Sequence, residues 1–237
     1  MYRIDIITIF PEMFDNFLKI SFIKKAQDKK KLVFDIYNLR DFSTDKHKKV
    51  DDEPFGGGAG MILKPEPIFA AIRHIKTKSS SKPHIILLTP QGNVFNQQKA
   101  KKFAEKHKHL VFVCGRYEGF DERVLEMIDE ELSIGDFVLS GGEIPAMVVS
   151  EAIVRLLPDV IGKKASFEND SFYGKYLDYP QYTRPAEFEG LKVPDVLING
   201  NHKEIKKWRK EKAILNTYKK RPDLLTKEEI ERIKETK

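Results

Sequence analysis

Residues 110–119 read Leu-Val-Phe-Val-Cys-Gly-Arg-Tyr-Glu-Gly, an apolar run that ends in a turn between two glycines. The run from Leu110 to Cys114 is long enough for a buried strand and too short for a helix. Asp121 and Glu122 follow, and carboxylates favour a helix start because they face its unpaired N–H groups. The stretch therefore predicts a buried strand, a tight turn and a helix.

Two further apolar runs end in the same way. Residues 137–139 stop at Ser-Gly-Gly (140–142), and residues 84–89 stop at Pro90, with Gly92 just beyond. Any one glycine after a strand is most often a plain turn. Three such turns together favour one crevice at the strand ends, which is where open α/β sheets bind ligands. Small residues there would let backbone N–H and C=O groups approach a flat polar molecule closely.

Apolar periodicity predicts strands that alternate with helices over residues 1–160, hence a mostly parallel α/β sheet. Besides the runs above, strands are expected at residues 2–10 and 32–37, and helices at 11–28, 65–75, 96–106 and 143–157. Beyond residue 194 the chain is expected to be helical, over 201–220 and again from Thr226, which forms a capping box with Glu229. We expect an α/β domain over 1–161, a linker over 162–177 and a basic helical domain over 178–237.

The distribution of charge is uneven. The formal net charge is +6, and residues 201–237 hold 13 Lys and Arg against 7 Asp and Glu, so the first 200 residues are balanced. A basic module joined to a neutral one predicts a polyanionic partner. The alternative is that Lys-rich helices only keep the protein soluble.

Composition excludes several classes of protein. The chain is 41% hydrophobic and 33% charged, as expected of a soluble globular protein. No apolar run approaches the roughly 20 residues that span a bilayer, so we expect no membrane partner. The first residues resemble a strand more than a signal peptide, and Cys114 alone excludes an internal disulfide. We expect a cytoplasmic protein.

Common catalytic and metal signatures are missing. The sequence has no G-x-S-x-G elbow, no H-E-x-x-H and no P-loop lysine, and its histidines have no metal-ligand spacing, so no metal site is predicted. Gly56, Gly58 and Gly60 match a loose G-x-G-x-G pattern. Residues 48–53 before them are charged, whereas a dinucleotide fingerprint needs a buried strand there. These glycines instead predict a surface loop that can approach a ligand.

Three longer runs resemble the bacterial tRNA (guanine-N1)-methyltransferases, the TrmD family of the SPOUT superfamily. They are Cys-Gly-Arg-Tyr-Glu-Gly (114–119), Ser-Ile-Gly-Asp-Phe-Val-Leu-Ser-Gly-Gly-Glu (133–143) and Asp-Tyr-Pro-Gln-Tyr-Thr-Arg-Pro (178–185). The resemblance extends from Ile4 to the C-terminal helices. It implies an α/β fold, with a mostly parallel sheet that contains a deep trefoil knot around residues 110–145, plus a small C-terminal α-helical domain.

The resemblance also implies an activity. Members transfer a methyl group from S-adenosylmethionine to N1 of guanosine 37 in tRNA, next to the anticodon. They act as homodimers with each active site at the subunit interface, and they require magnesium.

By match to the family, Asp170 would be the general base and Arg155 would assist it. The backbone-dominated cofactor site would comprise Leu88, Thr89, Pro90, Gly115, Tyr117, Glu118, Ser133, Ile134, Gly135, Asp136, Phe137, Val138, Leu139, Gly141 and Gly142. Contacts to tRNA or its guanine would come from Gly58, Gly60, Asp178, Arg184, Lys206, Lys207 and Arg209. Without the resemblance, Asp170 would be interpreted as a solvated loop acid and Arg155 as the partner of Glu151.

The chemistry explains why a base and a guanidinium are needed. Guanine N1 carries a proton and no free in-plane lone pair, so a carboxylate must remove that proton. Negative charge then develops toward O6, where a guanidinium can stabilise it. Alignment of the reacting atoms supplies much of the remaining rate. No covalent intermediate is needed, which agrees with the missing nucleophile signatures.

Two differences from the family pattern and two alternatives accompany this prediction. Ala59 stands where the family commonly has proline, and Phe137 where it often has tyrosine. A non-catalytic RNA-binding protein would be expected to lose Asp170 or the strand-end glycines. A knotted RNA ribose 2'-O-methyltransferase would not be expected to carry the 178–185 motif.

Overall fold

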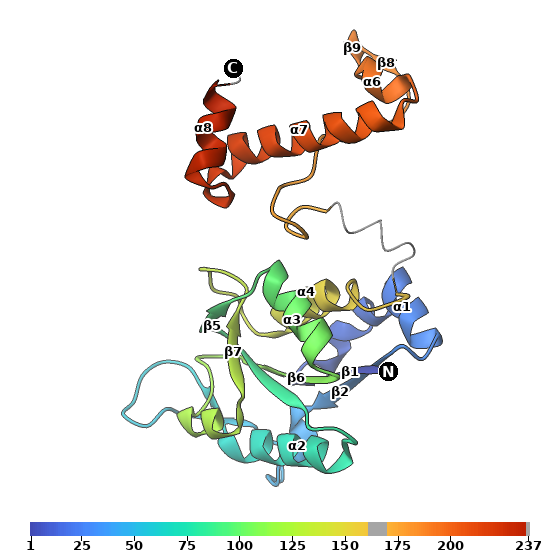
Figure 1. Ribbon diagram of the computed structural model, residues 1–237. Coiled ribbons are helices and arrows are strands. Elements are labelled where there is room, and N and C mark those ends of the chain that lie inside the picture. The colour runs from blue at the N-terminus through green and yellow to red at the C-terminus, as the bar shows by residue number, and fades with distance from the viewer. Residues whose placement is uncertain (161–169, 236–237) are drawn as a thin grey trace. The chain divides into compact units, whose positions relative to one another are not determined.

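The computed structural model describes residues 1–160 and 170–235. The chain divides into two compact units, residues 1–162 and 163–237 (Figure 1). Part of the predicted linker, residues 162–169, lies outside the described residues. Its remainder, residues 170–177, belongs to the second unit.

A five-stranded parallel sheet forms the centre of the first unit. Its order is β2 (Leu32–Asn38), β1 (Tyr2–Thr8), β6 (His109–Cys114), β5 (His84–Val94) and β7 (Glu130–Ser133). Every residue of β6 is buried, as expected of a central parallel strand covered on both faces, which needs a continuous apolar run. The predicted parallel α/β sheet is confirmed.

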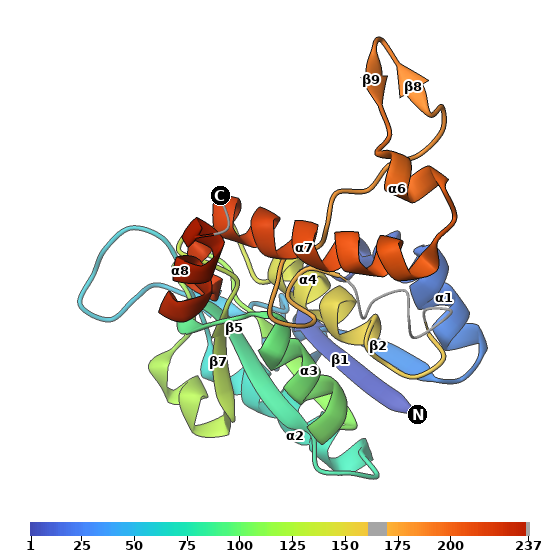
Figure 2. The same ribbon diagram turned by 45° about the horizontal axis from the view of Figure 1, so that its top comes forward.

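Helices cover both faces of this sheet (Figures 1 and 2). One face packs against α1 (Ser21–Asp28), α3 (Gln97–Lys106) and α4 (Glu143–Val154), and the other against α2 (Pro65–Lys78). Because side chains alternate along a strand, Ile4 and Ile6 of β1 point into the first layer and Ile7 into the second. Shorter elements complete the unit: η1 (Pro11–Phe14), η2 (Phe17–Lys19), η3 (Leu39–Phe42), η4 (Glu122–Met127), β3 (Asp51–Asp52) and β4 (Ile62–Leu63).

Three local predictions were wrong. The helix expected over 11–28 is two 3-10 turns, which bury Phe14 and Phe17, followed by α1. The helix expected after Asp121 is only the 3-10 helix η4, which Asp121 caps by accepting a hydrogen bond from the Arg123 N–H at 3.0 Å. Residues 137–139 form an exposed loop, not a strand.

The second unit is mainly helical. It contains α6 (Asp195–Ile198), α7 (His202–Lys220), η5 (Pro222–Leu224) and α8 (Lys227–Glu235), with a hairpin of β8 (Glu187–Phe188) and β9 (Leu191–Lys192). Asn201 caps α7 by accepting from the Lys203 and Glu204 N–H groups. The predicted capping box of α8 is confirmed, because Glu229 accepts from the Thr226 N–H at 2.8 Å and donates its own N–H to Thr226 Oγ1 at 3.3 Å.

Residues 170–178 are hydrogen-bonded to helices α7 and α8 of the second unit. Tyr176 Oη donates to Glu229 at 2.8 Å, and the Leu177 N–H donates to Thr217 Oγ1 at 2.9 Å. Asn216 Nδ2 donates to the carbonyl of Asp178 at 2.8 Å. The segment that carries Asp170 therefore shares its stability with α7 and α8.

We expect Glu229 to make the stability of the second unit fall in acid. Hydrogen bonds from Lys175, from the Thr226 N–H and from Tyr176 lower the pKa of Glu229 from 4.5 to about 2. Because the folded-state pKa lies below the unfolded one, this stabilisation is complete above about pH 4.5 and is lost as the pH falls toward about 2. Trp208 is the only tryptophan, and it lies on α7. Urea unfolding followed by its fluorescence therefore measures the loss.

The variant Glu229→Gln should weaken this pH dependence and lower the unfolding midpoint at neutral pH. Glu231→Gln, on the same helix, is the matched control and should keep the pH dependence of the original chain. An identical acid response in Glu229→Gln and the original chain would contradict the assignment.

Candidate active site

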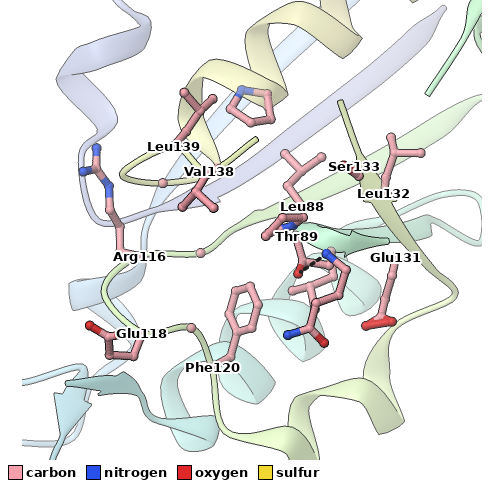
Figure 3. A pocket seen from close by; sticks show the side chains of 18 of the residues that line it. Leu88, Thr89, Arg116, Glu118, Phe120, Glu131, Leu132, Ser133, Val138 and Leu139 are labelled. Atoms are coloured by element: carbon pink, nitrogen blue, oxygen red, sulfur yellow. Dashed lines mark hydrogen bonds between the residues drawn. The ribbon is translucent and has the colours of Figure 1, made fainter. Parts of the chain in front are cut away.

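A cavity of about 390 Å³ opens at the carboxyl ends of β6 and β7 and beside residues 87–91 of β5, where the pairing with β7 shifts register (Figure 3). Leu88 and Thr89 reach it from β5, and Arg116, Glu118 and Phe120 from the loop after β6, as the figure shows. The loop after β7 closes it with Val138 and Leu139. The carboxyl ends of parallel strands are where open α/β sheets bind ligands, so this cavity is the crevice that the three glycine turns predicted.

The lining of this cavity includes most of the residues predicted for the cofactor site. All of the predicted residues line the cavity except Asp136. Residues outside that predicted set line it as well, among them Gln91, Arg116, Phe120, Glu131 and Leu132. Glu131 and Leu132 were missed because they belong to β7, which the sequence pattern did not indicate.

Two loops of the cavity wall touch backbone to backbone. The Gly142 N–H donates to the Gly115 carbonyl at 2.9 Å, and Arg116 forms an isolated β-bridge with Gly141. A Cβ on Gly142 would lie 2.7 Å from Cys114 Cα and 3.0 Å from the Gly115 nitrogen. Glycine is therefore required at Gly142, because no side chain fits between these loops.

A buried ion pair holds the loop after β6. Glu143, at the start of α4, is 1% exposed and accepts from Thr8 Oγ1 at 2.8 Å and from Arg116 Nε at 3.1 Å. The Arg116 guanidinium also lies over the Phe10 ring, 4.5 Å from its centroid. A carboxylate at a helix N-terminus is favoured by the helix dipole. In the sequence, the sign of this network was an acidic residue, Glu143, at the start of a mainly apolar helix.

Cys114 lies next to this ion pair and is not a nucleophile. Burial, and secondly the charge of Glu143, raise the pKa of the Cys114 thiol well above its ordinary value. The thiol therefore stays protonated, and the thiolate is the reactive form. Cys114 is therefore a small apolar residue of the core.

Replacing Glu143 by alanine should lower the free energy of unfolding by about 3 kcal/mol, because it leaves the Arg116 charge largely buried without its partner. Chemical denaturation of the whole chain measures this. Lys24→Ala is the reference variant, since Lys24 pairs with Asp28 on the solvent-exposed surface. An exposed ion pair contributes about 0.5 kcal/mol to stability. Equal losses in the two variants would contradict a structural role for the buried pair.

The charge of the cavity wall is mainly negative. Among the described residues that line it, Glu118, Asp121, Glu122 and Glu131 carry carboxylates and Arg116 is the one cationic residue. Arg123, which donates to the Asp121 side chain, lowers the pKa of that carboxyl. A wall of this sign favours a ligand that carries positive charge.

The glycine loop at residues 56–60 is joined to the cavity wall at its base. The Glu118 N–H donates to the Met61 carbonyl at 3.0 Å, and a Cβ on Gly60 would collide with the Glu118 side chain. Gly60 therefore lies beside the cavity. Gly58 has only Pro54 nearby, 3.9 Å from a Cβ built on it.

The two predicted catalytic residues belong to different units. Arg155 follows the last residue of α4, where its N–H donates to the Glu151 carbonyl at 3.1 Å. Asp170 is half-buried in the second unit, where its carbonyl accepts from the Tyr173 N–H at 3.1 Å. Their pairing remains a prediction.

The predicted tRNA contacts outside the glycine loop lie in the second unit. Asp178 organises a turn, since its carboxylate accepts from the Tyr179 N–H at 2.8 Å and from Gln181 Nε2 at 3.1 Å. Arg209 lies over the Tyr179 ring, 4.9 Å from its centroid. Three more cations are exposed to solvent: Arg184, Lys206 and Lys207.

Two kinds of feature are absent from the described residues. In residues 1–160 and 170–235, no three His, Cys, Asp or Glu side chains lie close enough together to hold a metal ion. No helix in the same part of the chain has the length and apolar character needed to cross a membrane.

Fold and cavity together define a class: an α/β protein with a parallel sheet covered on both faces and a cavity at the strand ends. A sequence profile described as tRNA (Guanine-1)-methyltransferase TrmD matches residues 2–227. The chain belongs to this family, which confirms the resemblance carried by the three motifs.

Individual relatives cover almost the whole chain. A protein of Dictyoglomus turgidum is 53% identical, over 100% of this chain and 97% of its own length. A Bacillus subtilis (strain 168) protein is 52% identical, over 94% of this chain and 92% of its own. A Bacillus cereus (strain AH820) protein is 50% identical, over 96% and 93%. Each is named tRNA (guanine-N(1)-)-methyltransferase.

Proposed function

We propose that this protein transfers a methyl group from S-adenosylmethionine to N1 of guanosine 37 in tRNA, next to the anticodon. The observation that carries the proposal is the family match, which spans residues 2–227. It includes the loops of the cavity and most of the basic helical unit, so both parts of the chain have counterparts in tRNA (guanine-N1)-methyltransferases.

The cavity suits the methyl donor. S-adenosylmethionine supplies an electrophilic methyl group on a sulfonium, and it also carries an ammonium group. The carboxylates of Glu118, Asp121 and Glu131 on the wall would favour these positive charges. Gly115 and Gly142 let the two loops of the wall meet backbone to backbone, and other backbone groups of these loops would hydrogen-bond the adenine and ribose.

Asp170 would remove the N1 proton of the guanine. Its carboxylate must come within hydrogen-bond reach of that proton when tRNA is bound. Arg155 would stabilise the negative charge that develops toward O6, because a guanidinium keeps its charge and can donate two parallel hydrogen bonds. Asp170 and Arg155 together thus raise the nucleophilicity of N1, and no covalent enzyme intermediate is involved.

A homodimer with composite active sites is part of the proposal. Apolar residues are exposed beside the cavity, and Val138 is 84% exposed. Ile144 and Val148 are exposed one turn apart on α4 and so share a face of that helix. Burying these side chains against a second copy would remove them from water, and Asp170 of one chain would then serve the cavity of the other. Light scattering should give twice the mass of one chain.

The resemblance extends the proposal in three further respects. The trefoil knot would involve residues 110–145, the protein would work in the cytoplasm where tRNA is modified, and magnesium would be required. The magnesium requirement is tested by removing divalent ions with EDTA and titrating magnesium back into the methyl-transfer assay. A rate that does not change would contradict it.

The deciding experiment uses labelled S-adenosylmethionine and two tRNA transcripts that differ only at position 37, guanosine or adenosine. Incorporation into the guanosine transcript alone is expected. Transfer to both transcripts would mean that the protein is a methyltransferase that acts on another base or on a ribose. No transfer to either, with cofactor binding intact, would leave a non-catalytic RNA-binding protein. Neither alternative is favoured by the family match.

A further inference from the structure

The second unit contains a cavity of its own, separate in sequence from the cofactor loops. Its volume is about 610 Å³, within the roughly 300–1,000 Å³ that is usual for small-molecule sites. It lies between residues 179–186, helix α6 and the first half of α7. Val193, Leu197 and Ile205 give it an aliphatic floor, and all three are half-buried.

Aromatic rings form one wall of this cavity. Tyr182 and Trp208 meet at 6.3 Å between ring centroids, tilted by 55°, and Tyr182 is still 49% exposed. Tyr179 adds a third ring, which already carries the guanidinium of Arg209 on its face. The wall therefore presents exposed π surface that α7 and the 179–186 segment hold in place.

The charge of this cavity is opposite to that of the cofactor cavity. The described lining includes Arg184 and Arg209 and no carboxylate, and the ammonium of Lys212 lies 5.8 Å from the centroid of the Trp208 ring. Aromatic rings flanked by arginine are how proteins hold unstacked bases of single-stranded RNA, with the base on the ring and the phosphates on the cations. A protein partner would need no such excess of positive charge.

We propose that this cavity binds one unpaired nucleobase of the tRNA, distinct from the guanosine that is methylated. The base stacks on Tyr182 and Trp208, and its neighbouring phosphates pair with Arg184 and Arg209. The identity of the RNA rests on the proposed function, whereas the stacking itself does not. The cavity would thus give the basic unit a specific anchor besides its general attraction for phosphate.

Trp208 reports directly on its own cavity, because it is the only tryptophan in the chain. Titrating the whole protein with a tRNA transcript should quench its fluorescence. Trp208→Ala should weaken binding of labelled tRNA about tenfold, the usual effect of losing one base stack. Trp208→Phe, which keeps an aromatic ring, should restore most of the affinity. Phe188→Ala, an exposed aromatic outside the cavity, should bind like the original chain.

Salt dependence separates stacking from charge. Trp208→Ala should leave the slope of log affinity against log salt unchanged, whereas Lys207→Ala should make it shallower by about one unit if Lys207 contacts a phosphate. Circular dichroism of each variant establishes that α7 is intact.

The other possible results of these experiments each decide for or against the base-binding cavity. Fluorescence that saturating tRNA leaves unchanged, or equal affinities for Trp208→Ala and the original chain, would overturn the inference even where guanosine 37 is methylated. Fluorescence that depends on protein concentration and not on RNA would also overturn it and assign the cavity to contacts between copies. Quenching by tRNA without any methyl transfer would support the cavity and refute the proposed function.

Discussion

Replacing Asp170 by alanine is expected to lower methyl transfer to guanosine 37 by a factor of about 100 to 10,000, the usual contribution of a general base. The affinity for S-adenosylmethionine should stay nearly unchanged, because Asp170 belongs to the second unit and the cofactor cavity is lined by residues of the first. Single-turnover transfer and calorimetric cofactor binding measure the two quantities separately.

Two further variants test whether Asp170 acts as the base. Asp170→Asn keeps the shape and hydrogen bonding of the side chain but cannot take a proton, so it should be as inactive as Asp170→Ala. Glu187→Ala removes an exposed carboxylate from the hairpin of the same unit and should stay active. If Asp170→Asn turns over at a near-normal rate, the base is another group.

Replacing Gly142 by alanine is expected to weaken cofactor binding by a factor between about 5 and 150. The new Cβ would lie 2.7 Å from Cys114 Cα and 3.0 Å from the Gly115 nitrogen, and backbone cannot move away as a flexible side chain could. The two loops must then separate, at the roughly 1–3 kcal/mol typical of overpacking, where about 1.4 kcal/mol is tenfold in affinity. Calorimetric titration with S-adenosylmethionine measures the loss.

Gly174→Ala is the matched control for this variant. Nothing lies within 4 Å of a Cβ at Gly174, and that residue is remote in sequence from the cavity loops. The control should bind the cofactor like the original chain. Unchanged binding by Gly142→Ala would mean that the contact between the loops is not needed to shape the cavity.

The two variants combined test whether the active site is shared between subunits. A dimer of Asp170→Ala chains lacks the base in both sites, and a dimer of Gly142→Ala chains lacks a proper cavity in both. A mixed dimer would contain one intact site. Random exchange of equal amounts of the two chains should therefore restore about one quarter of the original activity, at a cofactor concentration that leaves the Gly142→Ala sites nearly empty. No recovery after confirmed exchange would place each base in its own chain's site.

Sequence patterns were reliable where a single local rule governs the structure. The continuous apolar run of β6 has few alternatives to a central parallel strand. The capping box of α8 joins residues three positions apart, so Thr226 and Glu229 were sufficient to locate it. The turn at Gly115 indicated one wall of the cavity for a similar reason, since it follows directly from β6.

The same patterns failed where the deciding contact was distant. β7 begins with two glutamates, and it is a strand because it pairs with β5 at the edge of the sheet. There Lys99 stabilises Glu130, their side chains meeting at 2.6 Å. Desolvation alone would raise the pKa of Glu130, and its hydrogen bonds with Lys99 and His84 bring that pKa below the ordinary value. The more apolar run at 137–139 has no such partner strand and remains a loop.

By itself, then, the sequence determined the parallel α/β class, the glycine turns, the basic helical end and, through its motifs, the family. Only the tertiary structure brought Thr8 and Glu143 together across 135 positions of the chain, and only it formed the aromatic cavity from residues 179–186 and α7. The physical reason is one of range. A turn or a cap is stabilised by neighbours along the chain, whereas a buried ion pair or a cavity wall depends on side chains that meet only after the whole unit has folded.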